Sequence, residues 1–248
     1  MNWKRLAVII GLSLIITLAF PVSNLSGEEI VQQARSACHE GNYQQAEELW
    51  LEVLETEDYQ WEANFFLGMT YLRLDDYENA ADYMEGAYQR RPTDYSTLVN
   101  YARILYNQDQ IEAARDILME LPADLRRSDE QYYNIRGLLA MAEGELELAA
   151  SSLEVAVEIN PENPHVRNNL GLTFIRDNRH EEAVEHLEHA AEQEPEIAYI
   201  YNNLGVAYEN LGRLQDARDA YEQALEINPD YISAELNYDR VQSRLADQ

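Results

Sequence analysis

The sequence contains very little cysteine, lysine, glycine and proline, and each shortage excludes a class of protein. Cys38 is the only cysteine, so the chain has no internal disulfide and no CxxC metal or redox motif. The simplest role for Cys38 is that of a small apolar residue on a helix, although it could also pair with another chain. Ten glycines and seven prolines among 248 residues are too few for a low-complexity or disordered protein.

Basic residues are also scarce, and this shortage limits the possible partners. The chain has 46 acidic residues against 18 basic ones, which gives a formal net charge of −28, and Lys4 is its only lysine. Nucleic-acid binding requires a basic surface, so no nucleic-acid partner is expected, and anionic lipid headgroups are disfavoured as well. Abundant carboxylates with little lysine fit either a protein from salty surroundings or an ordinary acidic repeat protein. The 46% apolar content is enough for a substantial core.

The first 26 residues have the pattern of a signal peptide or of an N-terminal membrane anchor. Lys4 and Arg5 precede an uncharged apolar run at residues 6–20, and polar residues follow Pro21. As a helix, residues 6–22 would be about 25 Å long, slightly short of a ~30 Å hydrocarbon core. No clear cleavage site is present, so an uncleaved anchor with its basic end in the cytoplasm is favoured. We expect export of residues 28–248, with the chain anchored and facing the periplasm or exterior. After cleavage it would be soluble in the periplasm or secreted.

One 34-residue stretch near the C-terminus defines the organisation of the chain. In residues 198–231, Leu204 and Tyr208 lie four apart on one helical face, and Ala217 and Tyr221 lie four apart on a second. Gly212 can adopt the left-handed conformation that ends the first of these helices. Pro229 ends the second, because the residue before a proline disfavours helix. The stretch therefore predicts a helix–turn–helix unit.

These residues resemble the tetratricopeptide (TPR) repeat, and the same pattern recurs upstream at the same period. The six predicted repeats are 27–60, 61–94, 95–128, 130–163, 164–197 and 198–231. Each has a turn-forming residue after its first helix and an alanine in its second helix. The turn residues are Gly41, Asp75, Asp109, Gly144, Asn178 and Gly212, and the alanines are Ala46, Ala80, Ala114, Ala149, Ala183 and Ala217.

Residues 232–248 read as a further helix that caps the array. Asp239 stands where a repeat would place its small packed residue, so this helix must keep one face in water. The resemblance therefore implies an all-α, right-handed superhelical solenoid of six TPR units plus a C-terminal capping helix, with thirteen helices in all. Each repeat would contact chiefly its neighbours.

In the TPR family the first helices line a concave groove that holds a peptide, and the resemblance implies such a groove here. The family's groove positions correspond to the second, fifth, ninth, twelfth and thirteenth residues of each repeat. Only Glu28, Glu62 and Glu209 are acidic among these thirty positions, so we expect the acidity to lie on the convex face and the ends. The candidate peptide-binding residues at or beside these positions are Arg35, Arg73, Asn100, Arg103, Tyr106, Asn134, Asn168, Asn169, Arg176, Tyr199, Asn202 and Asn203.

Each of these candidates has an alternative, purely structural interpretation. The arginines and tyrosines could bind a partner segment, or they could pack between adjacent first helices. The asparagines could bind a peptide backbone with both donor and acceptor, or they could form a hydrogen bond within the repeat to a neighbouring helix. The lysines with which chaperone-binding TPR proteins clamp a carboxylate are missing, so the resemblance does not imply that activity.

Catalysis finds little support in the sequence. No nucleophile elbow, phosphate-binding loop or dinucleotide fingerprint is present. His186 and His189 lie three apart beside Glu182 and Glu185, which is a possible metal site. They flank apolar residues of a helix, however, and are expected to face solvent. We therefore predict no enzyme, no cofactor and no metal.

The resulting hypothesis is a non-enzymatic adaptor of the cell envelope that binds a protein or peptide partner in its groove. TPR proteins of this kind resemble assembly factors. The alternative is a self-assembling structural scaffold that uses its convex face or its ends, with the groove unused. The sequence identifies neither the partner nor the oligomeric state.

Overall fold

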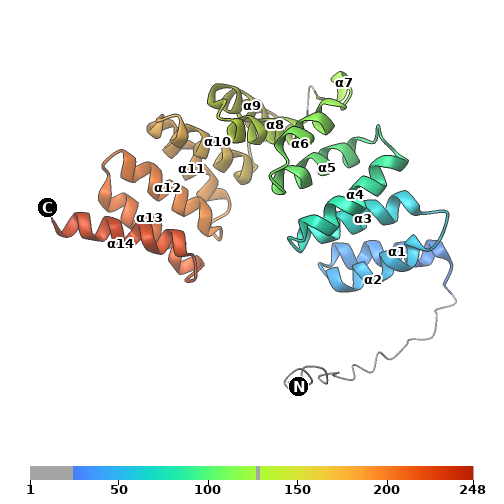
Figure 1. Cartoon of the computed structure of the whole chain (residues 1–248). Helices are drawn as coiled ribbons and strands as arrows, with labels where there is room; N and C mark the ends of the chain where they lie inside the picture. Colours follow the sequence, from blue (N-terminus) through green and yellow to red (C-terminus); the bar gives the residue numbers. More distant parts are fainter. Residues whose placement is uncertain (1–24, 127–128, 248) are drawn as a thin grey trace, which may run out of the picture.

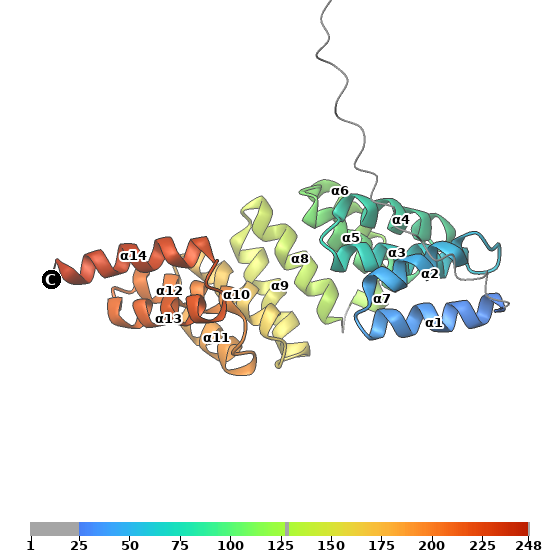
Figure 2. The same ribbon diagram turned by 90° about the horizontal axis from the view of Figure 1, so that it is seen from below.

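The computed structural model describes residues 25–126 and 129–247 and shows a solenoid of paired helices. The described residues form helices and turns without a strand. The helices follow one another along an arc from α1 to α14 (Figures 1 and 2). Their bounds are α1 Gly27–His39, α2 Tyr43–Leu54, α3 Gln60–Arg73, α4 Tyr77–Arg90, α5 Tyr95–Asn107, α6 Ile111–Met119, α7 Ala123–Arg126, α8 Glu130–Glu143, α9 Leu146–Ile159, α10 Pro164–Arg176, α11 His180–Gln193, α12 Ala198–Asn210, α13 Leu214–Ile227 and α14 Ile232–Ala246.

The turn inside every pair is made by a residue in the left-handed conformation, as the sequence pattern predicts. These six residues have φ between 56° and 80°, and they are Gly41, Asp75, Asp109, Gly144, Asn178 and Gly212. Glycine adopts this conformation without strain, and Asp and Asn tolerate it better than other residues do. The first helix of each pair therefore ends at a defined point, and the second helix begins two residues after the turn residue.

Within a pair, a small residue on the first helix receives a large side chain from the second. A Cβ added to Gly171 would lie 2.6 Å from Cγ of Leu187, and one added to Gly205 would lie 2.5 Å from the ring of Tyr221. Leu187 and Tyr221 are fully buried at these contacts. The recurring second-helix alanines are also fully buried. Small residues thus let the two helices approach closely enough to bury their apolar faces.

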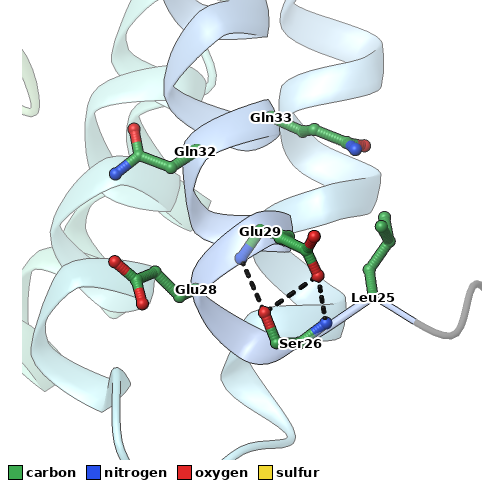
Figure 3. A pocket seen from close by; sticks show the side chains of 6 residues that line it. All are labelled: Leu25, Ser26, Glu28, Glu29, Gln32 and Gln33. Carbon is green, nitrogen blue, oxygen red and sulfur yellow. Dashed lines mark hydrogen bonds between the residues drawn. The ribbon is translucent and has the colours of Figure 1, made fainter.

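The N-terminal end of the described array is closed by a capping box. Ser26 and Glu29 bond to each other at the start of α1 (Figure 3). The Ser26 amide donates to Oε2 of Glu29 at 2.8 Å, and the Glu29 amide donates to Oγ of Ser26 at 3.4 Å. These bonds satisfy two amides that a helix start leaves without partners, and Glu29 also complements the positive end of the helix dipole. Hydrogen bonds from Ser26 lower the pKa of Glu29.

The third repeat departs from the regular pattern, so the described residues hold fourteen helices and not thirteen. Helix α6 has only 9 residues, whereas the other second helices have 12 to 14. The reason is Pro122, which forces Leu121 away from the helical conformation and so stops the second helix early. The short helix α7 follows it. Leu121 remains buried at the position that an alanine or valine fills in the other repeats.

The C-terminal end is closed by α14, which is joined to the last repeat through one carboxylate. Glu209 of α12 accepts hydrogen bonds from Arg240 at 2.6 and 2.9 Å and from Arg244 at 2.7 Å. The Tyr221 hydroxyl also donates to Glu209, at 3.1 Å. These bonds, with that from Arg240 foremost, lower the pKa of Glu209. The outer face of α14 stays in solvent, since Ile232 and Leu236 are 67% and 63% exposed.

No helix within residues 25–126 and 129–247 combines the length and the apolar character needed to cross a membrane. The predicted signal peptide or anchor at residues 1–26 lies almost wholly outside these residues, and its apolar stretch at 6–22 lies wholly outside them.

Candidate functional site

Consecutive first helices contact one another and form a continuous surface, which we call the first-helix face. It consists of α3, α5, α8, α10 and α12, and it continues into α14. The predicted groove positions project from these helices because residues three and four apart share one side of a helix. All the predicted site residues except Arg35, which belongs to α1, lie on helices of this face, and their individual contacts distinguish two groups among them.

The first group consists of arginines that give the face positive charge. Arg103 donates to Oε1 of Gln131 on the next first helix at 3.2 Å. Burial lowers the pKa of Arg103, and the positive charge of Arg73 lowers it further. Arg73 itself is exposed. The like charge of Arg73 on the neighbouring repeat thus disfavours the charged form of Arg103, and the negative charge of Glu130 partly offsets this effect.

Two of the three acidic residues at the predicted groove positions are neutralised by arginines from outside that set. Glu209 is held by Arg240 and Arg244, and Glu62 lies 3.5 Å from Arg91. These pairings remove negative charge from the face. The charged residues that then remain at the groove positions of these helices are Arg73, Arg103 and Arg176, in a chain whose net charge is −28.

Three successive repeats meet around Tyr106. Arg176 of α10 donates to the Met141 carbonyl of α8 at 3.5 Å, a long hydrogen bond. Burial raises the pKa of the Tyr106 hydroxyl, and the charge of Arg176 opposes this rise. The charge of Arg176 thus acts on Tyr106 although the two residues are two repeats apart.

Two further predicted residues lie toward the ends of the array. Arg35 of α1 lies over the ring of Phe66, 5.9 Å from its centroid, which is a cation–π contact with α3. Tyr199 of α12 is 37% exposed, and its hydroxyl lies 2.6 Å from Nδ1 of His165 on α10. His165 was not among the predicted site residues. It could have been found from its position, because it is the second residue of the fifth repeat and Tyr199 is the second residue of the sixth.

The second group consists of asparagines that bond one repeat to the next. In three successive steps the amide nitrogen of a sixth-position asparagine donates to the side-chain oxygen of the fifth-position asparagine one repeat earlier. The bonds are Asn169 to Asn134 at 3.0 Å, Asn203 to Asn168 at 2.9 Å and Asn237 to Asn202 at 2.9 Å. We call this series the asparagine ladder. Asn168 and Asn202 are buried within it.

Asn237 on the capping helix extends the ladder by one step. Its position as sixth residue after Tyr231 could have predicted this bond. Asn100 stands apart, because its amide donates to the Ser96 carbonyl of its own helix at 2.8 Å. The ladder bonds therefore join successive repeats, whereas the structural alternative drawn from the sequence expected bonds within a repeat.

The histidine pair on α11 does not have the predicted exposure. His186 is half-buried, with its ring 5.5 Å from that of Phe174 and its Nδ1 3.5 Å from Arg167. Burial lowers its pKa, and the charge of Arg167 adds to this effect. No group of three or more potential metal ligands occurs within the described parts of the chain. His186 therefore packs against Phe174 of α10, and its burial disfavours the charged form of the ring.

The sequence matches family models described as Tetratricopeptide repeat over most of its length. The matched residues are 31–95, 71–139, 140–204 and 198–231. The last of these ranges is the same helix–turn–helix stretch, residues 198–231, in which the repeat pattern is most regular. The chain belongs to the tetratricopeptide repeat family. No protein of curated function matches the sequence closely enough to show a relationship.

Solved TPR structures share the fold. TTC0263 of Thermus thermophilus is 24% identical, covers 73% of this chain and 98% of its own, and superposes with a TM-score of 0.64. Pseudomonas aeruginosa PilF is 17% identical over 88% of this chain and 97% of its own, with a TM-score of 0.70. YrrB, a TPR protein with an unusual peptide-binding site, is 18% identical over 75% of this chain and 95% of its own, with a TM-score of 0.51. TPR proteins generally mediate protein–protein interaction, and this chain has their scaffold.

Proposed function

We propose that this TPR protein is a non-enzymatic adaptor that holds an acidic segment of a partner protein along its first-helix face. The charge of that face supports the proposal. Arg73 and Arg103 repel each other there, and Glu209 is already neutralised by the capping helix. A partner carboxylate between the two arginines would relieve this repulsion and would form charge-assisted hydrogen bonds with both.

The roles of the predicted site residues divide accordingly. The asparagine ladder fixes the spacing of successive first helices, because each of its bonds joins neighbouring repeats. Arg73, Arg103, Tyr106 and Arg176 are left to contact the partner. Arginine and tyrosine are the residue types that contribute most to protein interfaces, since both combine apolar area with directional hydrogen bonds.

Replacing Arg103 and Tyr106 together by alanine is expected to weaken partner binding at least about tenfold, because each truncation at a binding hot spot costs on the order of 1–2 kcal/mol. The partner is first captured by crosslinking in cells and identified. Its binding to the purified full chain is then measured directly. The expected weakening diminishes at high salt, since the attraction is electrostatic.

The matched control is Arg218→Ala. Arg218 lies on the second helix α13, which is not part of the first-helix face, and it pairs with the adjacent Asp219. This variant should bind the partner as the unmodified protein does. Unchanged binding by the double variant, together with loss of binding by Arg218→Ala, would show that the first-helix face is not used. The alternative, self-assembly through the C-terminal end, predicts that the sedimentation coefficient of the purified protein rises with its concentration. It replaces the adaptor role if no partner is captured and if Leu236→Ser on α14 abolishes this rise.

We further propose that the adaptor works in the cell envelope, held by an uncleaved helix at residues 6–22. The basic residues Lys4 and Arg5 before an apolar run support this orientation. Deleting residues 1–26 should move the protein from the membrane fraction to the soluble cytoplasm, because the deletion removes the apolar run and its basic flank, together with Ser26 of the α1 capping box. If the undeleted protein is found only in the soluble cytoplasm, export is contradicted. If the undeleted protein is recovered from cells without its first 26 residues, the segment is cleaved.

A further inference from the structure

The early end of α6 leaves a cavity between the third and fourth repeats. Pro122 ends the second helix about one turn early, so α6 and α8 are less closely joined than the corresponding helices elsewhere. The cavity has a volume of about 260 Å³ and is lined by residues of α6, α7, α8 and α9. Met119 at its edge is 63% exposed, whereas Leu118 and Leu139 deeper inside are buried.

This cavity is separate from the first-helix face. Its α8 residues, among them Tyr132, Arg136 and Leu139, occupy the third, seventh and tenth positions of the fourth repeat. None of these is a predicted groove position. A ligand in the cavity would therefore leave Arg103 and Tyr106 untouched.

Three arginines surround the cavity, and the protein uses them to different degrees. Arg115 forms an ion pair with Glu143. Arg126 donates to the carbonyls of Leu121 and Met119 and lies over the ring of Tyr132. Arg136 is half-buried and has no hydrogen bond or ion pair with the described residues. With one carboxylate among three guanidinium groups, the lining carries a net positive charge in a strongly acidic protein.

We propose that this cavity binds one apolar side chain of a partner polypeptide, with an adjacent carboxylate of that polypeptide paired to Arg136. The volume supports a side chain, because sites for cofactors and drug-sized molecules usually enclose about 300–1,000 Å³. The apolar walls from Leu118, Leu139 and Leu148 match the side chain. The charge of the lining selects the flanking acid, since a basic flank would face three arginines.

The test uses two synthetic peptides and the full chain in nanodiscs of zwitterionic lipid. One peptide is acetyl-Gly-photoleucine-Asp-Asp-Gly-amide, and its counterpart carries two lysines in place of the aspartates. After illumination, trypsin fragments are analysed by mass spectrometry. The acidic peptide should crosslink to residues 116–126 or 137–167, which contain Met119 and Leu148 respectively. The lysine peptide should not crosslink there.

Arg136→Gln should lower the yield of this crosslink about tenfold, because a charge-assisted hydrogen bond is lost. In this variant the crosslink is sought in residues 116–126 and 128–167, since the substitution removes the tryptic site after residue 136. Arg103→Ala should leave the yield unchanged, which separates this site from the first-helix face. As a second variant, Met119→Glu places a like charge at the exposed edge and should also lower the yield. Equal yields for both peptides, an unchanged yield in both Arg136→Gln and Met119→Glu, or crosslinks confined to first-helix-face residues would overturn the proposal.

Discussion

Replacing Trp50 by alanine should lower the free energy of unfolding by about 3–5 kcal/mol, the usual cost of removing a large buried aromatic side chain. Trp50 is fully buried in the first repeat. Its ring stacks on Phe66 of the next repeat, with centroids 4.8 Å apart and planes 7° apart. Its indole N–H also donates to Sγ of Cys38 at 3.3 Å. The substitution therefore removes contacts both within the first repeat and between the first two.

The loss should be local, because each repeat of a solenoid contacts chiefly its neighbours. Hydrogen exchange should accelerate throughout residues 27–74 and stay slow in α10 to α13, while urea denaturation followed by circular dichroism gives the total change. Leu51→Ala is the matched control, since Leu51 follows Trp50 on the same helix and is 38% exposed. A uniform acceleration along the whole chain would contradict the local character of the effect.

Placing leucine at Gly171 should cost about 3 kcal/mol or more, at the upper end of the range for overpacked cores. Even a Cβ at this position would lie 2.6 Å from Cγ of Leu187, and Leu187 is fully buried. The clash involves Cγ, the branch point of that side chain, which moves only if the whole buried side chain changes its χ1 rotamer. Helices α10 and α11 must separate, and the contacts of the fifth repeat with both of its neighbours weaken as a result.

A second substitution shows whether this clash causes the loss. Leu187→Ala in the Gly171→Leu background should restore part of the stability, although each change alone destabilises the protein. Glu181→Leu serves as the control for an added leucine, because Glu181 is exposed on α11, and its effect should stay within about 0.5 kcal/mol. Additive losses in the double variant, measured by urea denaturation, would show that the two positions do not oppose each other.

Local sequence determined the regular parts of the fold. The six turn residues were recognisable because few residue types tolerate positive φ, and all six adopt it. The buried alanines recur at one period, and that period identifies the packed face of each second helix. The capping helix was recognisable from Asp239, which cannot be packed as a small residue and is exposed.

The candidate site was only partly predictable. Repeat positions indicate which side chains share the first-helix face, but not which partner within the protein each of them has. Glu209 illustrates the difference: its position suggested a ligand contact, and its neutralisation by Arg240 and Arg244 depends on how α14 docks. The asparagine ladder similarly required the distance between successive first helices.

The amino-acid sequence by itself determined the six repeats, their turns, their close helix contacts and the cap, because these follow from periodicity and from the conformations that single residues allow. Only the tertiary structure decided the contacts between repeats. It joined the asparagines across neighbouring helices, and it opened a cavity lined by Met119 and Arg136 among others. Such contacts depend on how far one repeat rotates and shifts against the next, and that geometry results from the packing of all their side chains together.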